Sequence, residues 1–471
     1  MSGSRVKTAS SRLEAKPRLA GRKVTVVGLG LTGEAAAEFL IKQGARVTVT
    51  DARAPEDQAG ELAARARKLA GLGATLELGG HQVGTFTGAD LILLSPGVPP
   101  SIEPMIKARV KGVPVTGEIE LASRFVAEPL VAVTGTNGKT TTTHLLGEMF
   151  KAAGREVFVG GNIGRPLIGH VLSGREADVA VIEVSSFQLE TAETFKPKVA
   201  ALLNVTPDHM DRYADGGEYL AAKARIFARQ EPDDFAVMNA DDVIVAHKSV
   251  QARRLDFSRL RPQTDGAYLK KNRLVLVWDG RGIGELPLSG LALKGAHNQE
   301  NILAAWLGAV ALGVEPEIAG RAAAAFRGLP HRVELVAEIK GVRYYDDSKG
   351  TNVGAVMKAL EGFSGPVVLI AGGRDKAGDF RPLRSLIRDK VKLLILLGEA
   401  KETMAAVLGR ETETILVEDM ARAVILARSR ARRGDVVLLS PACASFDMFQ
   451  DYAHRGRVFA GLVREFTDGG R

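Results

Sequence analysis

Short runs of apolar, often β-branched residues alternate with stretches of helical periodicity along most of this chain. Most of these runs end in a glycine-rich or polar turn, and apolar residues at helical spacing follow. Strands that alternate with helices in this way are typical of α/β domains. The pattern therefore predicts an α/β fold with mostly parallel sheets.

The alternation divides the 471 residues into three blocks behind a short tail. At about 150 residues per domain, a chain of this length is expected to hold about three domains. The expected boundaries are a basic, disordered tail at 1–20 and domains at 21–117, 118–328 and 329–471. We expect the first and last domains to be Rossmann-like and the central one to resemble a P-loop ATPase.

Composition narrows the class of protein. Hydrophobic residues make up 45% and charged residues 25% of the chain, which is typical of soluble globular proteins and excludes fibrous and wholly disordered ones. No segment approaches the ~18 uncharged apolar residues that span a bilayer, and residues 1–20 lack the apolar core of a secretory signal. The single cysteine, Cys443, allows no intramolecular disulfide, and its small neighbours indicate a packed interior thiol. We therefore expect a cytoplasmic protein that does not insert into membranes.

The position of the charge decides how it is interpreted. The net charge is +8, but residues 1–23 hold seven bases and one acid, so the rest of the chain is nearly neutral. A nucleic-acid-binding protein needs a basic face on its folded domain. We therefore expect the basic segment to be a solvated arm, with an organelle transit peptide as the alternative, and we expect no nucleic-acid partner. We also expect a monomeric protein.

A glycine-rich turn, Gly28–Gly33, follows the predicted strand Lys23–Val27 and opens a helix, and Asp51 ends the next strand. Glycines in such a turn let the backbone approach a diphosphate at a helix N-terminus, and the acid can take a ribose hydroxyl. The pattern fits any nucleotide diphosphate. A tight turn before a well-packed helix is the structural alternative.

The segment Thr134–Thr141 (TGTNGKTT) follows a second predicted strand, Leu130–Val133, and precedes a helix. Its backbone amides can cradle the β- and γ-phosphates of a nucleotide, Lys139 can reach the γ-phosphate, and the Thr140 hydroxyl can bind Mg²⁺. The segment departs from the usual phosphate-loop pattern because Val133 occupies the first glycine position. Two phosphate-binding turns in separate blocks predict two phosphorylated ligands, and an oxidoreductase would not need the second.

Polar side chains follow later strands of the central block, namely Glu183, Asp208 and His209. The carboxyl ends of parallel strands meet at one edge of a sheet, so we expect these groups near the phosphate loop, where they suit a Mg²⁺ site. Lys223 lies in the apolar stripe of the predicted helix Glu218–Ala228. One alternative is that such a lysine extends its ammonium to water. The other is that it is buried, in which case its pKa must shift, or it must find a partner or be modified.

Two later segments carry further polar groups. Asn298 and Asn301 stand on one face of a predicted helix, where their amides either contact adenine or cap the helix. In the third block, Lys349, Arg374 and Lys376 follow predicted strands and form either an anion site or ordinary solvated loops.

Taken in order, the segments GLGLTG, TGTNGKTTT, EVSSFQLE, NVTPDHMDRY, HNQEN, DDSKGTN and SPACASFD resemble the Mur ligase family, and the likeness extends from about Lys23 to Phe459. The resemblance implies a first domain that binds a UDP-sugar, a second that binds ATP and two Mg²⁺ ions, and a third that binds an amino acid. It also implies the reaction, which is ATP-dependent ligation of D-glutamate to UDP-N-acetylmuramoyl-L-alanine through an acyl phosphate. This reaction is a step of peptidoglycan precursor synthesis.

The resemblance further implies roles for individual residues. The catalytic residues would be Lys139, Glu183, His209, Lys223 and Lys349. The ATP-binding residues would be Gly135, Thr136, Asn137, Gly138, Lys139, Thr140, Thr141, Asn298, Asn301, Arg332 and Asp347. The metal ligands would be Thr140, Glu183, His209 and Lys223, the last as a carbamate formed with CO₂. The substrate-binding residues would be Leu31, Thr32, Asp51, Arg53, Ser95, Gly97, Asn162, Ser185, Thr351, Lys376, Ser445 and Phe446.

Two other functions stay open at this level. Another ligase of the superfamily, similar to folylpolyglutamate synthetase, would share the phosphate loop but would not need the block that holds Gly28–Gly33. A nucleotide-switch binding protein would use the loop without ligation. The chain lacks the N-K-x-D guanine motif, which argues against a GTPase of this kind.

Overall fold

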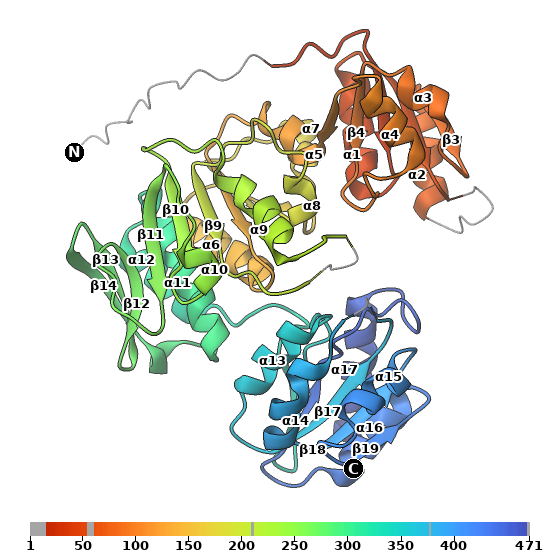
Figure 1. Cartoon of the computed structure of the whole chain (residues 1–471). Helices are drawn as coiled ribbons and strands as arrows, with labels where there is room; N and C mark the ends of the chain where they lie inside the picture. Colours follow the sequence, from red (N-terminus) through yellow and green to blue (C-terminus); the bar gives the residue numbers. More distant parts are fainter. Residues whose placement is uncertain (1–15, 54–60, 209–211, 376–377, 469–471) are drawn as a thin grey trace.

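The computed structural model describes residues 16–53, 61–208, 212–375 and 378–468, and these form three α/β bodies (Figure 1). Sheets of five, nine and six strands make the centres of the three bodies in the described part of the chain. Most neighbouring strands run parallel, so the predicted fold class is confirmed. The exact boundaries of the domains stay a prediction.

The first body is a parallel sheet in the order β3-β2-β1-β4-β5. Its strands are β1 Lys23–Val27, β2 Arg46–Asp51, β3 Thr75–Leu78, β4 Leu91–Leu94 and β5 Val115–Gly117. Its helices are α1 Leu31–Lys42, α2 Glu61–Gly71, α3 Val83–Thr87 and α4 Glu103–Val110. Alternate side chains of the strands pack in two clusters, one with α1 and α2 and one with α3 and α4. Both faces of the sheet are therefore covered, and the carboxyl ends of its strands meet at one edge.

The central body has the strand order β14-β13-β12-β11-β10-β9-β6-β8-β7. Its strands are β6 Leu130–Thr134, β7 Val157–Gly161, β8 Val179–Glu183, β9 Val199–Leu202, β10 Phe235–Asn239, β11 Arg253–Ser258, β12 Gly266–Lys270, β13 Arg273–Trp278 and β14 Arg281–Pro287. Strands β6 to β12 pair in parallel, whereas β13 and β14 add an antiparallel extension that the sequence analysis did not predict.

The helices of the central body cover both faces of this sheet and carry several predicted site residues. They are α5 Glu118–Ser123, α6 Lys139–Ala152, α7 Leu167–Ser173, α8 Ser186–Leu189, α9 Gly216–Ala224, α10 Val243–Ala246, α11 Ala296–Ala311 and α12 Pro316–Ala325. The predicted helix Glu218–Ala228 is shorter than expected, because α9 ends at Ala224 and a 3₁₀ turn, Arg225–Phe227, follows.

The third body has the strand order β15-β16-β20-β17-β18-β19, in which β15 alone is antiparallel to its neighbour within the described sheet. Its strands are β15 Glu334–Ile339, β16 Val342–Asp346, β17 Val367–Gly372, β18 Val391–Leu397, β19 Thr414–Leu416 and β20 Val436–Leu439. Its helices are α13 Val353–Glu361, α14 Arg384–Lys390, α15 Lys401–Leu408, α16 Met420–Arg430 and α17 Tyr452–Asp468. Cys443 is buried here, as expected.

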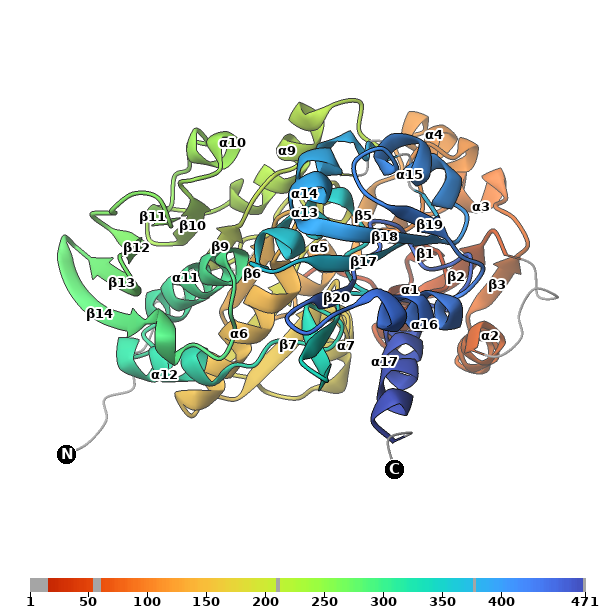
Figure 2. The same ribbon diagram turned by 90° about the horizontal axis from the view of Figure 1, so that it is seen from below.

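The bodies are joined in two different ways. One continuous apolar cluster contains Phe39 of α1, Ile119 of α5 and Leu167 of α7, so the first body packs on the central one through buried hydrophobic side chains. The apolar clusters described for the third body contain residues of that body alone. Helix α13 contacts α11, and both views show α13 on the side of the third body that faces α11 (Figures 1 and 2). In the described part of the chain, no helix has the length and apolarity needed to cross a bilayer.

Candidate active site

The phosphate loop lies between β6 and α6, where the chain turns from a buried strand into a helix N-terminus. Gly135 and Gly138 have φ angles of +152° and +86°, which favour glycine. A Cβ added to Gly138 would lie 2.3 Å from Oδ1 of Asn301 on α11. The side chain of Asn204, which follows β9, accepts a 2.8 Å hydrogen bond from the Asn137 N–H and donates one of 3.1 Å to the Asn137 carbonyl. Asn204 thus holds the loop, and the sequence analysis missed it.

Lys139 is the first residue of α6 and folds back over its own loop. Its ammonium donates hydrogen bonds of 2.9 Å to the carbonyls of Gly135 and Thr136. Burial lowers the pKa of Lys139, although the nearby carboxylate of Glu183 opposes this effect. The ammonium therefore stands at the loop, and its contact with a γ-phosphate stays a prediction.

Four of the predicted site residues meet next to this loop. Thr140 donates a 2.6 Å hydrogen bond to one carboxylate oxygen of Glu183, and Asn162 donates a 2.9 Å bond to the other. Arg332, from the linker before the third body, donates to the Thr140 hydroxyl at 2.5 Å. Burial would raise the pKa of Glu183, but the Lys139 ammonium and the two hydrogen bonds lower it below its ordinary value. The carboxylate is therefore ionised at neutral pH.

Lys223 is buried, with 1% of its surface exposed, so the alternative of an ammonium extended to water is wrong. Its nitrogen donates a 2.9 Å hydrogen bond to the Gly135 carbonyl and lies 4.3 Å from the centre of the Tyr219 ring. Burial, and after it the neighbouring Lys139, lower the pKa of Lys223 well below its ordinary value. The structure thus brings Lys223 to the phosphate loop and favours its neutral amine form.

Asp208 connects the central body with the third. The side-chain amide of Asn352, the residue before α13, donates a 3.3 Å hydrogen bond to the carboxylate of Asp208. Together with the bond from Arg332 to Thr140, this contact ties the third body to the edge of the central sheet that carries the loop. The predicted metal ligand His209 lies outside the described residues.

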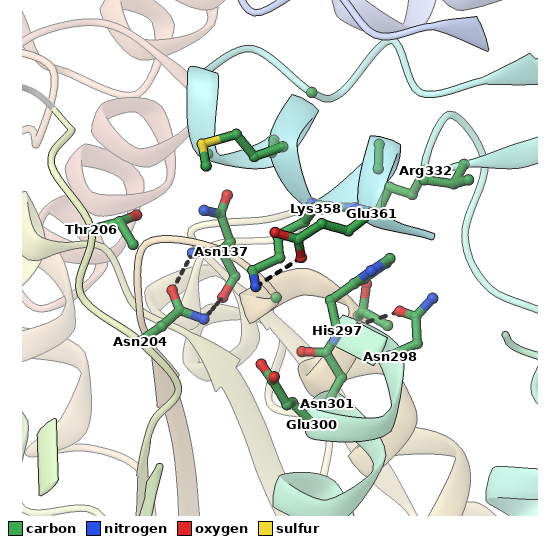
Figure 3. Close-up of a pocket in the computed structure, with 18 of the residues that line it drawn as sticks. Asn137, Asn204, Thr206, His297, Asn298, Glu300, Asn301, Arg332, Lys358 and Glu361 are labelled. Atoms are coloured by element: carbon green, nitrogen blue, oxygen red, sulfur yellow. Dashed lines mark hydrogen bonds and ion pairs between the residues drawn. The ribbon is translucent and has the colours of Figure 1, made fainter. Parts of the chain in front are cut away.

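A cavity of about 520 Å³ lies between the central and third bodies beside the loop (Figure 3). The predicted site residues that line it are Asn137, Gly138, Thr141, Asn298, Asn301, Arg332, Asp347 and Lys349. Residues that the sequence analysis missed also line it, among them Asn204, Thr206, His297, Glu300, Lys358 and Glu361. Of these, His297 and Glu300 stand beside the two predicted asparagines on α11, so that motif could have indicated them.

The two predicted asparagines of α11 form a chain of hydrogen bonds. Asn298 donates to the Lys294 carbonyl at 2.7 Å, and its side-chain oxygen accepts a 3.3 Å bond from Asn301. The Asn301 oxygen in turn accepts a 3.3 Å bond from the Thr142 hydroxyl on α6. The chain couples the N-terminal turns of α6 and α11, so Asn301 supports the loop as well as lining the cavity.

Several titratable groups of the cavity have shifted pKa values, among them His297 and Asp347. Burial, and after it Lys358, lower the pKa of His297 to about 4, so its ring is neutral at neutral pH. Burial raises the pKa of Asp347 to about 7, although Ser440 donates a 2.6 Å hydrogen bond to its carboxylate. Groups with shifted pKa values in one cavity are typical of functional sites.

The glycine turn of the first body is tightly built. A Cβ on Gly33 would lie 1.9 Å from the Gly28 carbonyl oxygen, so only glycine fits there. Asp51 accepts a 2.7 Å hydrogen bond from the Leu29 N–H and three more from Arg53, at 3.0, 2.8 and 2.7 Å. Its carboxylate is therefore held by the turn and by Arg53, and its contact with a nucleotide stays a prediction.

The other predicted substrate residues of the first two bodies lie near the carboxyl ends of strands. Leu31 and Thr32 begin α1, and Leu31 is 58% exposed. Ser95 is buried and donates to the Gly28 carbonyl at 3.3 Å, whereas Gly97 is exposed. Ser185 caps α8 through reciprocal hydrogen bonds with Gln188.

In the third body, the residues predicted to bind D-glutamate lie on adjacent loops. Thr351 follows β16 and Ser445 follows β20, which pair in parallel. Ser445 is buried, while Phe446 is 64% exposed.

The three cations considered for an anion site in this body have different surroundings. Lys349 lines the cavity, and its ammonium lies 3.8 Å from the centre of the Tyr452 ring. Arg374 forms a two-point ion pair with Glu399, at 2.9 and 2.7 Å. Lys376 lies outside the residues that the structure describes.

Models of Mur ligase domains match each of the three bodies. The model described as "Mur ligase MurD-like, N-terminal domain" matches residues 22–117, "Mur ligase middle domain" matches 133–309, and "Mur ligase, glutamate ligase domain" matches 331–443. The chain therefore belongs to the Mur ligase family, and the resemblance seen in the sequence is confirmed.

Within this family, the chain is similar to curated enzymes that share one name. The UDP-N-acetylmuramoylalanine--D-glutamate ligase of Geotalea daltonii is 50% identical over 451 residues, which are 95% of this chain and 98% of the relative. The enzyme of the same name from Pelotomaculum thermopropionicum is 48% identical over 452 residues, which are 95% of this chain and 98% of the relative.

Solved structures share the fold at low sequence identity. The pseudomurein peptide ligase type C from Methanothermus fervidus has a TM-score of 0.60 and 20% identity, covering 95% of this chain and 100% of the other. The MurF ligase from Thermotoga maritima in complex with ADP has a TM-score of 0.59 and 19% identity, covering 97% and 100%. At these identities the likeness shows the fold alone.

Proposed function

We propose that this protein joins D-glutamate to UDP-N-acetylmuramoyl-L-alanine, with conversion of ATP to ADP and phosphate, in peptidoglycan precursor synthesis. The observation that carries the proposal is 48 to 50% identity, over about 95% of the chain, to ligases named for these substrates. The phosphate loop and the adjoining cavity support it, because they offer a place for a nucleoside triphosphate.

The first chemical step is transfer of the γ-phosphoryl group. A carboxylate oxygen of the alanyl group attacks the γ-phosphorus, and the bond from that phosphorus to the β,γ-bridging oxygen breaks, which gives an acyl phosphate and ADP. Lys139 and Arg332 neutralise the charge that moves through the phosphates. Both cations already stand at the loop, where Lys139 contacts Gly135 and Arg332 contacts Thr140.

The second step forms the amide bond. The amine of D-glutamate attacks the acyl carbon through a tetrahedral intermediate, the bond from that carbon to the phosphate oxygen breaks, and the nitrogen loses a proton. We assign the binding of D-glutamate to the loops that carry Thr351, Lys376, Ser445 and Phe446, and we assign catalytic contact across the cavity to Lys349. These loops belong to the third body, so the site is complete only when that body lies against the central one.

The donors near the loop fit Mg²⁺. The Thr140 hydroxyl and the Glu183 carboxylate are hard oxygen groups whose atoms lie 2.6 Å apart. We assign one ion to this pair and a second to His209 and Lys223. When bound with ATP, Mg²⁺ neutralises phosphate oxygens and orients the γ-phosphate.

Lys223 fits the second ion only if it is modified. An ammonium would repel a cation, whereas a carbamate offers anionic oxygen. Carbamate formation joins the neutral amine nitrogen to the carbon of CO₂ with loss of one proton. Burial disfavours the charged form of Lys223 and lowers its pKa, which favours the neutral amine that this reaction needs.

The remaining assignments place the other ligands. We assign the uridine diphosphate to the Gly28–Gly33 turn, with Leu31, Thr32, Asp51, Arg53, Ser95 and Gly97 around it, and the muramoyl group to Asn162 and Ser185. The adenosine lies in the cavity beside Asn298 and Asn301. We further propose a monomeric, cytoplasmic protein without a nucleic-acid partner, with domain boundaries after residues 20, 117 and 328.

The test is phosphate release by the purified full-length protein from ATP and Mg²⁺. Release should require UDP-N-acetylmuramoyl-L-alanine and D-glutamate together, and Lys139→Ala should abolish it. Release with a folate and glutamate instead would favour the folylpolyglutamate synthetase-like alternative. Nucleotide binding without any ligation product would favour the switch protein. Saturable binding of NAD, with no binding of the UDP compound, would refute the assignment of the glycine turn.

A further inference from the structure

The linker that enters the third body has an unusual backbone on both sides of Arg332. His331 has a φ of +63° and Val333 a φ of +49°. The left-handed region is disfavoured for residues with a side chain, and most strongly for a β-branched residue such as valine. Such conformations persist only where the surroundings hold them, and they are concentrated at functional sites.

Three hydrogen bonds hold His331 in this conformation. Its Nδ1 lies 2.6 Å from a carboxylate oxygen of Asp346, at the end of β16. Its N–H donates a 2.9 Å hydrogen bond to Glu334, and its carbonyl accepts one of 3.1 Å from the Lys349 N–H. The ring and both backbone groups of His331 are thus fixed to the third body.

Two further contacts hold the linker, one at His331 and one at Val333. Helix α17 presents Gly456 to the histidine, and a Cβ there would lie 2.2 Å from Nδ1 of His331 and 2.5 Å from Oδ2 of Asp346. The pair can form as it does because position 456 lacks a side chain. On the other side of Arg332, the N–H of Val333 donates a hydrogen bond to the carboxylate of Asp347.

The same side chains could suggest a metal site, since donor atoms of His331, Glu334 and Asp346 lie within 4.8 Å of one another. The 2.6 Å between Nδ1 and the Asp346 oxygen is a direct hydrogen bond, however. The N–H groups of His331 and Ser348 also donate to Glu334 and to the other oxygen of Asp346, so both carboxylates already accept hydrogen bonds within the third body. The cluster therefore serves as a structural clamp.

We propose that His331 is a positioning residue that holds the Arg332 guanidinium at the phosphate loop, an inference that rests on the proposed function. Arg332 and Val333 line the cavity, whereas His331 is not among the residues described as lining it. The guanidinium spans the two bodies to reach the Thr140 hydroxyl at 2.5 Å. The backbone conformations of His331 and Val333 set the direction in which the Arg332 side chain points. Release of His331 would let the linker relax to an ordinary conformation and would turn Arg332 away from the loop.

The experiment measures binding of a non-hydrolysable ATP analogue with Mg²⁺ by calorimetry, together with kcat and the KM for each substrate, in the full-length protein. His331→Ala should weaken analogue binding about tenfold or more and lower kcat, which is the scale of losing one charge-assisted hydrogen bond. The KM for the UDP-sugar should not change. His331→Asn should recover part of the loss, because asparagine tolerates the left-handed region and its amide can still donate to Asp346. Gly456→Ala should reproduce the loss without altering either partner.

A double-mutant cycle separates positioning from a purely structural role. In an Arg332→Ala background, His331→Ala should cause no further loss of analogue affinity, because it acts through the arginine. Two matched controls should leave the affinity unchanged. His170→Ala removes a histidine–carboxylate pair of the same 2.6 Å length, with Glu128, and Lys340→Ala alters another left-handed residue of the third body, at φ +51°.

The outcomes for the two proposals differ. Unchanged affinity in His331→Ala and in Gly456→Ala would overturn the positioning role, and so would additive losses in the cycle or equal losses in the controls. A wild-type protein that fails to ligate, but whose analogue binding responds as described, would refute the proposed function and leave the clamp in place.

Discussion

Replacing Asp51 by asparagine would measure what holds the glycine turn of the first body. Burial opposes ionisation of Asp51, but hydrogen bonds from Arg53 and Leu29 more than offset it and lower the pKa from 3.8 to about 2. At about 1.36 kcal/mol per pKa unit, this lowering corresponds to about 2 kcal/mol in favour of the folded state at neutral pH. The Arg53 side chain is 55% exposed, so solvent screens part of the interaction. We expect Asp51→Asn to destabilise the first body by about 1–2 kcal/mol.

The dependence of this loss on pH has a definite sign. The folded pKa lies below the unfolded one, so the stabilisation is complete above about pH 4 and disappears as the pH falls towards 2. Hydrogen exchange in β1 and β2 is the suitable assay, because Trp278 and Trp306 both lie in the central body and their fluorescence does not report on the first. A variant as protected as the wild type at pH 7, or a difference that has already vanished at pH 5.5, would refute the reasoning.

Three further predictions test the assigned sites. Lys223→Ala should lose most activity and regain part of it when formate or acetate supplies a carboxylate. Lys223→Arg should stay nearly inactive, because arginine cannot readily form a carbamate. Full turnover of the arginine variant would contradict the modification of Lys223. Gly33→Ala should weaken binding of the UDP compound, since its Cβ would lie 1.9 Å from the Gly28 carbonyl oxygen. The matched control is Gly84→Ala in α3, outside the turn, where an added Cβ would meet no atom within 4 Å. Lys376→Ala should raise the KM for D-glutamate far more than that for ATP, and two unchanged constants would make it an ordinary surface lysine.

Local features of this fold could be predicted because the signals are local. The predicted strand Leu91–Leu94 has the same bounds in the structure, since four consecutive apolar residues between polar ones fit a strand buried on both faces. The glycines at 135 and 138 indicated the phosphate loop, where the backbone needs positive φ angles. The apolar stripe indicated that Lys223 had an unusual environment, because its neighbours on the helix were visible in the sequence.

Long-range features could not be predicted in this way. Asn204 supports the loop from β9, and Lys358 reaches the cavity from a helix of another body. No periodicity along the chain records which distant segments meet. The same holds for the hydrogen bond from the Leu29 N–H to Asp51, which depends on how the turn closes over the carboxylate.

The way the third body meets the central one bears on how fast the protein can release what it binds. The described contacts at the loop include the Arg332–Thr140 and Asn352–Asp208 hydrogen bonds, whereas the first body is attached through a shared apolar cluster. A hydrogen bond contributes about 0.5–1.5 kcal/mol net, somewhat more when charged, so two of them favour the docked arrangement by roughly ten- to a thousandfold. Motions of one domain against another occur on the microsecond-to-millisecond scale. Exchange of nucleotide can therefore proceed by undocking of the third body alone, while the first body stays in place.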